Sequence, residues 1–100
     1  PVSTWGMPFP ADARALPPLS GTARGTWGES AYNNYAKDAT VAALTATLQQ
    51  AKNWSATYNR PVFCGEFGSY NRAADADSRC RYMGAVVSAL GKMAIPFTYW

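Results

Sequence analysis

The sequence predicts an α/β fold with a parallel sheet. A helical period covers 35–59, a short apolar run follows at 61–66, and the same order repeats over 75–91 and 95–100. Two strands joined through a helix form a β-α-β unit, whose strands lie parallel in nearly every known case. With 48% hydrophobic and 14% aromatic residues, the composition is that of a globular chain and excludes a disordered one.

Residues 1–34 are predicted to be a loop. Five of the seven prolines lie in the first eighteen residues, which discourages both helix and central strand. Loops of this length are uncommon in compact domains unless they have a function. Its large apolar side chains, Trp5, Phe9 and Trp27, therefore either bind a ligand or pin the loop to the structure beside it.

The helix expected over 35–59 has apolar residues at spacings of three and four. Asp38 is its expected N-cap or first-turn acid, where a negative charge meets the positive end of the helix dipole. Asn59-Arg60-Pro61 ends it, because the residue before a proline disfavours helix.

The strand expected over 61–66 ends on a carboxylate, Glu66, with Gly65 before it and Gly68 two positions after it. Strict alternation would place Val62, Cys64 and Glu66 on one face of the sheet and Phe67 on the other. A carboxylate at the end of an apolar strand must meet water, a partner or a substrate, since burying it unpaired is costly.

The second helix is expected to be capped by Asp75 or Asp77 and to end at Gly91, with Arg79 and Arg81 on its solvated side. The strand over 95–100 follows, with Thr98 and Trp100 on one face. Tyr70 lies in the loop after Glu66, at the end of a parallel sheet where active sites are built.

Several functional classes are disfavoured. The nine basic residues are scattered, so the chain lacks the stripe of positive charge expected of a nucleic-acid binder. It also lacks a run of eighteen apolar residues, which would be needed to predict a membrane span. With no histidine and two cysteines, a zinc site lacks its usual ligands. Cys64 and Cys80 are expected on opposite faces of the sheet, which favours free, buried thiols and leaves a disulfide as the alternative.

The motif Gly65-Glu66-Phe67-Gly68, the helix after it and the terminal Ile95–Trp100 strand together resemble glycoside hydrolase family five, which includes many cellulases. The resemblance implies a (β/α)8 TIM barrel, which needs ~250 residues. The chain would then supply only the C-terminal part: helix 6, strand 7, helix 7 and strand 8.

The resemblance also implies a retaining endo-β-1,4-glucanase without a cofactor. Glu66 would be the nucleophile, and Trp100, Tyr70 and Trp5 would contact β-glucan. The acid/base glutamate belongs to an earlier strand with no match here, so the isolated chain is expected to be inactive. The family implies secretion, although Pro1-Val2-Ser3-Thr4 does not have the pattern of a signal peptide.

Two alternatives remain from the residues themselves. The first is a non-catalytic module that binds carbohydrate through Trp5, Trp27, Tyr70 and Trp100. The second is a fragment that associates with itself, in which a second copy, rather than the remainder of a barrel, completes the exposed strand edges.

Overall fold

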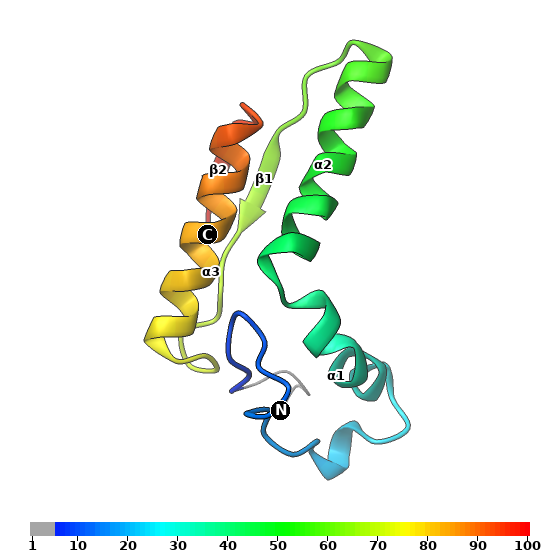
Figure 1. The fold of residues 1–100 in the computed structure, drawn as a ribbon, viewed down its shortest axis with the longest axis vertical. Coiled ribbons are helices and arrows are strands. Elements are labelled where there is room, and N and C mark those ends of the chain that lie inside the picture. Colours follow the sequence, from blue (N-terminus) through cyan, green and yellow to red (C-terminus); the bar gives the residue numbers. More distant parts are fainter. Residues whose placement is uncertain (1–5) are drawn as a thin grey trace.

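The computed structural model describes residues 6–100, so the predicted ligand contact at Trp5 lies outside the described residues. The elements in chain order are η1 (Gly21–Ala23), α1 (Trp27–Asp38), α2 (Val41–Tyr58), β1 (Cys64–Phe67), α3 (Ala76–Lys92) and β2 (Phe97–Tyr99). β1 and β2 form a two-stranded parallel sheet, and α3 connects them. The predicted α/β order and parallel pairing are confirmed. In Figure 1, α2 and α3 flank β1, and the N-terminal segment lies beyond the arrowhead of β1.

The prediction that residues 1–34 are loop is wrong from Trp27 onward, because α1 begins there. Its start is well capped. The Thr26 hydroxyl accepts a hydrogen bond from the Gly28 N–H (3.1 Å), and the Glu29 carboxylate accepts one from the Gly25 N–H (2.8 Å). A threonine followed three positions later by a glutamate is the capping-box pattern, which outweighs the lack of apolar periodicity in this stretch.

The single helix predicted over 35–59 is two helices. Asp38 ends α1 instead of capping the next helix, and Thr40 takes that role, since its hydroxyl accepts a hydrogen bond from the Ala43 N–H (3.0 Å). The predicted end is confirmed at Asn59, which adopts the left-handed conformation (φ 48°) that often closes a helix.

The later elements differ from their predicted bounds by a few residues. β1 begins three residues later than the predicted 61–66 strand and ends one residue after it. β2 covers only the central part of 95–100, because pairing across the two-stranded sheet runs from Cys64 with Phe97 to Phe67 with Tyr99. Of the two predicted capping residues of α3, Asp75 is the cap. Its carboxylate accepts a hydrogen bond from the Ser78 N–H (2.7 Å). Gly91 is not the C-cap. α3 continues through it to Lys92, and Met93 is the cap residue.

The core lies between the two long helices and the sheet. Val86 and Leu90 of α3 and Ile95 just after it are buried, and Leu90 has 0% exposure. Side chains from α2, from β1 and from the residues just before β1 cover this cluster, namely Leu44, Leu48, Val62, Cys64 and Phe67. The packing fixes β1 against α3 and so positions the residues at the end of β1.

Candidate functional site

Glu66 lies in an irregular part of β1 and is exposed. Cys64 pairs with Phe97 and Phe67 pairs with Tyr99, so Gly65 and Glu66 together stand opposite the single residue Thr98. This arrangement is a β-bulge, which breaks the alternation of side chains and re-aims the residue within it. The Thr98 hydroxyl donates a hydrogen bond to the Gly65 carbonyl and ties the bulge to β2.

The bulge makes the predicted alternation wrong. Cys64 and Phe67 were expected on opposite faces, yet both pack against the buried cluster of α3. Phe67 therefore shares the Cys64 face instead of the opposite one. The isolated glycine inside the strand, Gly65, is the sequence signal that could have indicated a bulge. Both cysteines are free, as favoured, but Cys80 is exposed, so the expectation that both thiols are buried is wrong.

Trp100 stands beside the end of β1. Its main-chain N–H donates a hydrogen bond to the Phe67 carbonyl (2.9 Å), and its side chain is 71% exposed. A β-carbon on Gly68 would overlap the Trp100 carbonyl oxygen and lie 3.3 Å from the indole Cε3. Gly68 is thus required for Trp100 to approach the segment that follows Glu66.

A cavity of about 230 Å³ opens where both strands end. Tyr70 and Trp100, two residues predicted to contact sugar, both line this cavity, although they are thirty positions apart in the sequence. Glu66 is not among the residues that line it, and Trp27 lies apart as an exposed residue at the start of α1. The lining residues are Ser69, Tyr70, Asn71, Arg79, Tyr99 and Trp100.

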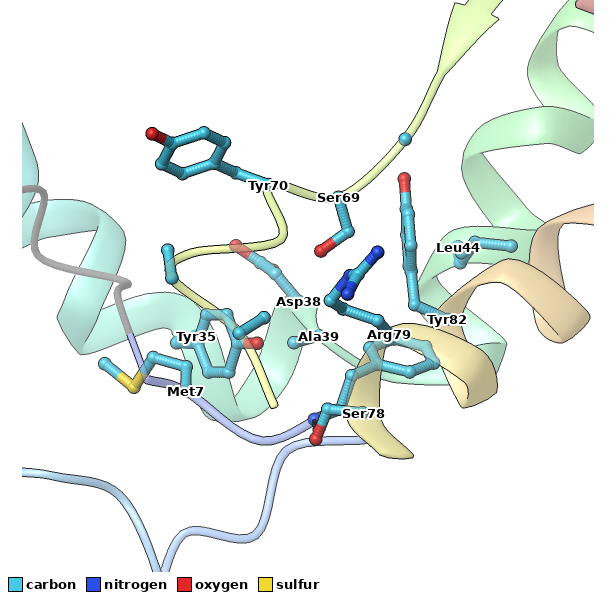
Figure 2. Close-up of a pocket in the computed structure, with 14 residues that line it drawn as sticks. Met7, Tyr35, Asp38, Ala39, Leu44, Ser69, Tyr70, Ser78, Arg79 and Tyr82 are labelled. Atoms are coloured by element: carbon cyan, nitrogen blue, oxygen red, sulfur yellow. Dashed lines mark hydrogen bonds between the residues drawn. The ribbon is translucent and has the colours of Figure 1, made fainter. Parts of the chain in front are cut away.

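A larger cavity of about 430 Å³ lies next to the first and shares Ser69, Tyr70 and Arg79 with it. It is bounded by the N-terminal segment that contains Met7 and Phe9, by the α1–α2 junction and by the first turns of α3 (Figure 2). Met7, Phe9, Tyr35, Leu44 and Tyr82 give it a mostly apolar wall, with Asp38 and Ser78 as polar members.

Arg79 is the site residue that the sequence interpretation missed. It was expected on the solvated side of its helix, but it is partly buried and lines both cavities. Its Nε atom is buried and has no hydrogen-bond partner. The signal was present in the spacing, since Arg79 falls three residues before Tyr82 and seven before Val86, on the buried stripe of α3.

Phe9 fixes the N-terminal segment against α3, which is one of the two roles expected for it. The Phe9 ring packs edge-on against Tyr82, with centroids 5.4 Å apart. Its N–H donates to the Ser78 hydroxyl (3.0 Å), and its carbonyl accepts from Arg81 Nε (2.6 Å). The segment is thereby held as one wall of the larger cavity.

Two tyrosines of the larger cavity are perturbed by burial. Loss of hydration raises the pKa of Tyr35 and of Tyr82, and negative charge on Cys64 adds to the effect on the pKa of Tyr82. The Tyr35 hydroxyl donates a hydrogen bond to the Pro8 carbonyl (3.2 Å). Both phenols are therefore neutral at physiological pH.

Between residues 6 and 100, no three histidine, cysteine or acidic side chains gather as metal ligands would. In the same described part, no helix is both long and apolar enough to cross a membrane.

Comparison with known proteins identifies the family of this chain. Endoglucanase 3 of Fibrobacter succinogenes is 32% identical over 99 residues, which cover 94% of this chain and 15% of that protein. The chain thus spans only a small part of that relative's length. Residues 21–100, which include β1, the smaller cavity and Trp100, match the family model described as cellulase, glycosyl hydrolase family 5. The chain belongs to glycosyl hydrolase family 5.

Proposed function

We propose that this chain carries the nucleophile side of a retaining endo-β-1,4-glucanase, with Glu66 as the nucleophile. The observation that carries the proposal is an exposed carboxylate on a β-bulge, two residues before a glycine that makes room for Trp100. The family supplies the reaction class, glycoside hydrolysis, and the name of the Fibrobacter relative supports internal cleavage of a glucan.

In this mechanism the Glu66 carboxylate attacks the anomeric carbon of the sugar and forms a covalent glycosyl-enzyme. A second carboxylic acid protonates the departing glycosidic oxygen, and then removes a proton from the water that releases the sugar. The two carboxyl groups of a retaining enzyme lie ~5–5.5 Å apart. Trp100, beside the end of β1, offers an aromatic face for a sugar ring, and Tyr70 lines the same cavity.

The second carboxylic acid is proposed to come from outside this chain, because the other five acids already have structural places. Asp12 pairs with Arg14 at 3.2 Å, Glu29 binds the Gly25 N–H, and Asp75 caps α3. Asp77 lies in the first turn of α3, and Asp38 ends α1. The chain alone would then lack half of the catalytic pair and be inactive.

The rest of the active site would be supplied by the remaining strands of a (β/α)8 barrel. In that arrangement α2 corresponds to helix 6, β1 to strand 7, α3 to helix 7 and β2 to strand 8. Exposed aromatic residues at the sheet support this assignment, since Phe63, just before β1, and Tyr99 of β2 leave 59% and 62% of their surface exposed. The radius of gyration, 15.0 Å, also exceeds the ~13 Å of a compact domain of this length.

These uncovered apolar residues call for neighbours, which the remainder of the same enzyme or a second copy would supply. The proposed substrate is a β-linked glucan, and the proposed location is extracellular. A purely carbohydrate-binding role is not favoured, because the family match covers most of the chain, including the proposed nucleophile.

The test is Glu66→Gln in the full-length enzyme, assayed on cello-oligosaccharides. We expect kcat to fall by roughly 1,000-fold or more, as for removal of other nucleophiles. Glu29→Gln is the matched control, because it makes the same chemical change in the chain's other glutamate, which caps α1. Full activity in Glu66→Gln would remove the nucleophile assignment.

A second variant separates a nucleophile from a structural acid. In Glu66→Ala, added azide should restore bond cleavage by attacking the anomeric carbon from the vacated side. The product would be a glycosyl azide of inverted configuration, detectable by NMR. A structural acid would show no such product.

A further inference from the structure

The two arginines on the first turns of α3 differ in how the protein satisfies them. Arg81 donates from Nε to the Phe9 carbonyl (2.6 Å) and from Nη2 to the Ser78 hydroxyl (3.0 Å). Arg79 has a buried Nε with no hydrogen-bond partner and borders both cavities. The first arginine is part of the scaffold, whereas the second lines both cavities and keeps a buried Nε that no described protein group accepts from.

No carboxylate of the described chain neutralises Arg79. Within residues 6–100 the single ion pair closer than 4.0 Å joins Arg14 and Asp12. Asp38 lines the larger cavity with Arg79, but the two do not form an ion pair (Figure 2). A partly buried cation without a partner is unfavourable, and an anion that enters the cavity would relieve that cost.

We infer that Arg79 binds the carboxylate of an acidic sugar unit, a uronic acid, in the polysaccharide. The inference rests on the proposed function, which places a polysaccharide at this end of the sheet. The planar guanidinium matches a carboxylate with two parallel hydrogen bonds, and such charge-assisted pairs are about twice as strong as neutral ones.

The walls of the smaller cavity suit a sugar ring that carries this group. Trp100 and Tyr99 offer aromatic surface, while Ser69 and Asn71 add polar groups. Figure 2 shows the Arg79 and Ser69 side chains pointing toward one another in the adjoining larger cavity. Both residues line the smaller cavity as well. The hydroxyl groups of a neutral sugar would accept hydrogen bonds from the Arg79 guanidinium but would leave its positive charge uncompensated.

The experiment compares two probes on the full-length enzyme. One is a neutral cello-oligosaccharide, and the other is the same oligosaccharide with some C6 alcohols oxidised to carboxylates. We expect calorimetry to show about tenfold tighter binding of the oxidised probe at low salt, with the advantage falling as salt rises. Arg79→Gln should bring the ratio close to one, and Arg79→Lys, which keeps the charge but loses the planar fork, should give an intermediate ratio.

Arg72→Gln is the matched control, because it removes the same charge from an exposed position in the preceding loop that lines neither cavity. It should retain the wild-type ratio. Thermal unfolding of each variant shows whether it is folded, and should Arg79→Gln fail to fold, the Arg79→Lys ratio and the salt dependence of the wild type decide.

Equal binding of the two probes by the wild type would overturn the inference, as would a preference that survives Arg79→Gln. Equal loss of both probes in Arg79→Gln would mean that Arg79 binds hydroxyls and would overturn the carboxylate assignment. Failure of the proposed function would be seen separately, because the wild type would then hydrolyse neither probe. Calorimetry would still give the ratio of the affinities for the oxidised and the neutral probe.

Discussion

Gly68 and Trp100 lie so close that a β-carbon at position 68 would overlap the Trp100 carbonyl oxygen. The contact joins the residue after β1 to the residue after β2, and the hydrogen bond from the Trp100 N–H to the Phe67 carbonyl (2.9 Å) holds the two chain segments together. The distance between the Glu66 strand and the exposed indole therefore depends on the absence of a side chain at one position.

Gly68→Ala should separate Trp100 from β1 and misplace the aromatic face. We expect kcat/KM on cello-oligosaccharides to fall roughly 10- to 100-fold in the full-length enzyme, since misplacement by about an ångström has effects of that size. Gly84→Ala is the control, because a β-carbon there has no neighbour within 4 Å. It should leave kcat/KM unchanged and add about 0.5–1 kcal/mol of stability. Equal kinetics in both variants would show that the Gly68 contact is not needed.

Leu90→Ala should test whether the cluster of α3 residues is the core that positions β1. Leu90 is fully buried, so we expect a loss of about 2–5 kcal/mol in the free energy of unfolding, measured by urea denaturation. Val87→Ala, on the same helix at 42% exposure, should cost about 0.5 kcal/mol. Similar losses for both would contradict the assignment of the core.

Tyr82 should make the protein less stable at alkaline pH. Its pKa is raised by burial and by Cys64 above the ordinary value of 10.0, so the folded state keeps a proton that the unfolded state releases. This contribution is fully present below pH 10 and is lost as pH rises through the folded pKa. Tyr82→Phe should therefore show a weaker fall in melting temperature above pH 10 than the wild type. Parallel curves for the two proteins would argue against a perturbed Tyr82.

The order of helices and strands could be read from the sequence because it depends on local rules. The apolar period of α2 and α3, the proline after Arg60 and the cap at Asp75 act over a few residues, and the structure bears them out. The start of α1 at Trp27 also had a local signal, the Thr26–Glu29 capping pair, which the search for apolar periodicity missed.

The site depended on relations that no local rule specifies. The bulge at Gly65 and Glu66 follows from the register between β1 and β2, and it places Cys64 and Phe67 on the same core. The unpartnered Nε of Arg79 depends on which segments pack around α3, and the N-terminal segment held by Phe9 lines the same cavity as Arg79. The register between the two strands determines the bulge, and packing between segments dozens of residues apart determines the surroundings of Arg79.

The sequence by itself determined the alternation of helix and strand, and placed Glu66 and Trp100 near the ends of neighbouring parallel strands. The tertiary structure alone decided that Tyr70 and Trp100 share a cavity, that Glu66 stands on a bulge, and that the Arg79 Nε is buried without a hydrogen-bond partner. The physical reason is range: helix capping and periodicity act within a few residues, whereas burial and cavity shape arise from segments that meet only when the chain is folded.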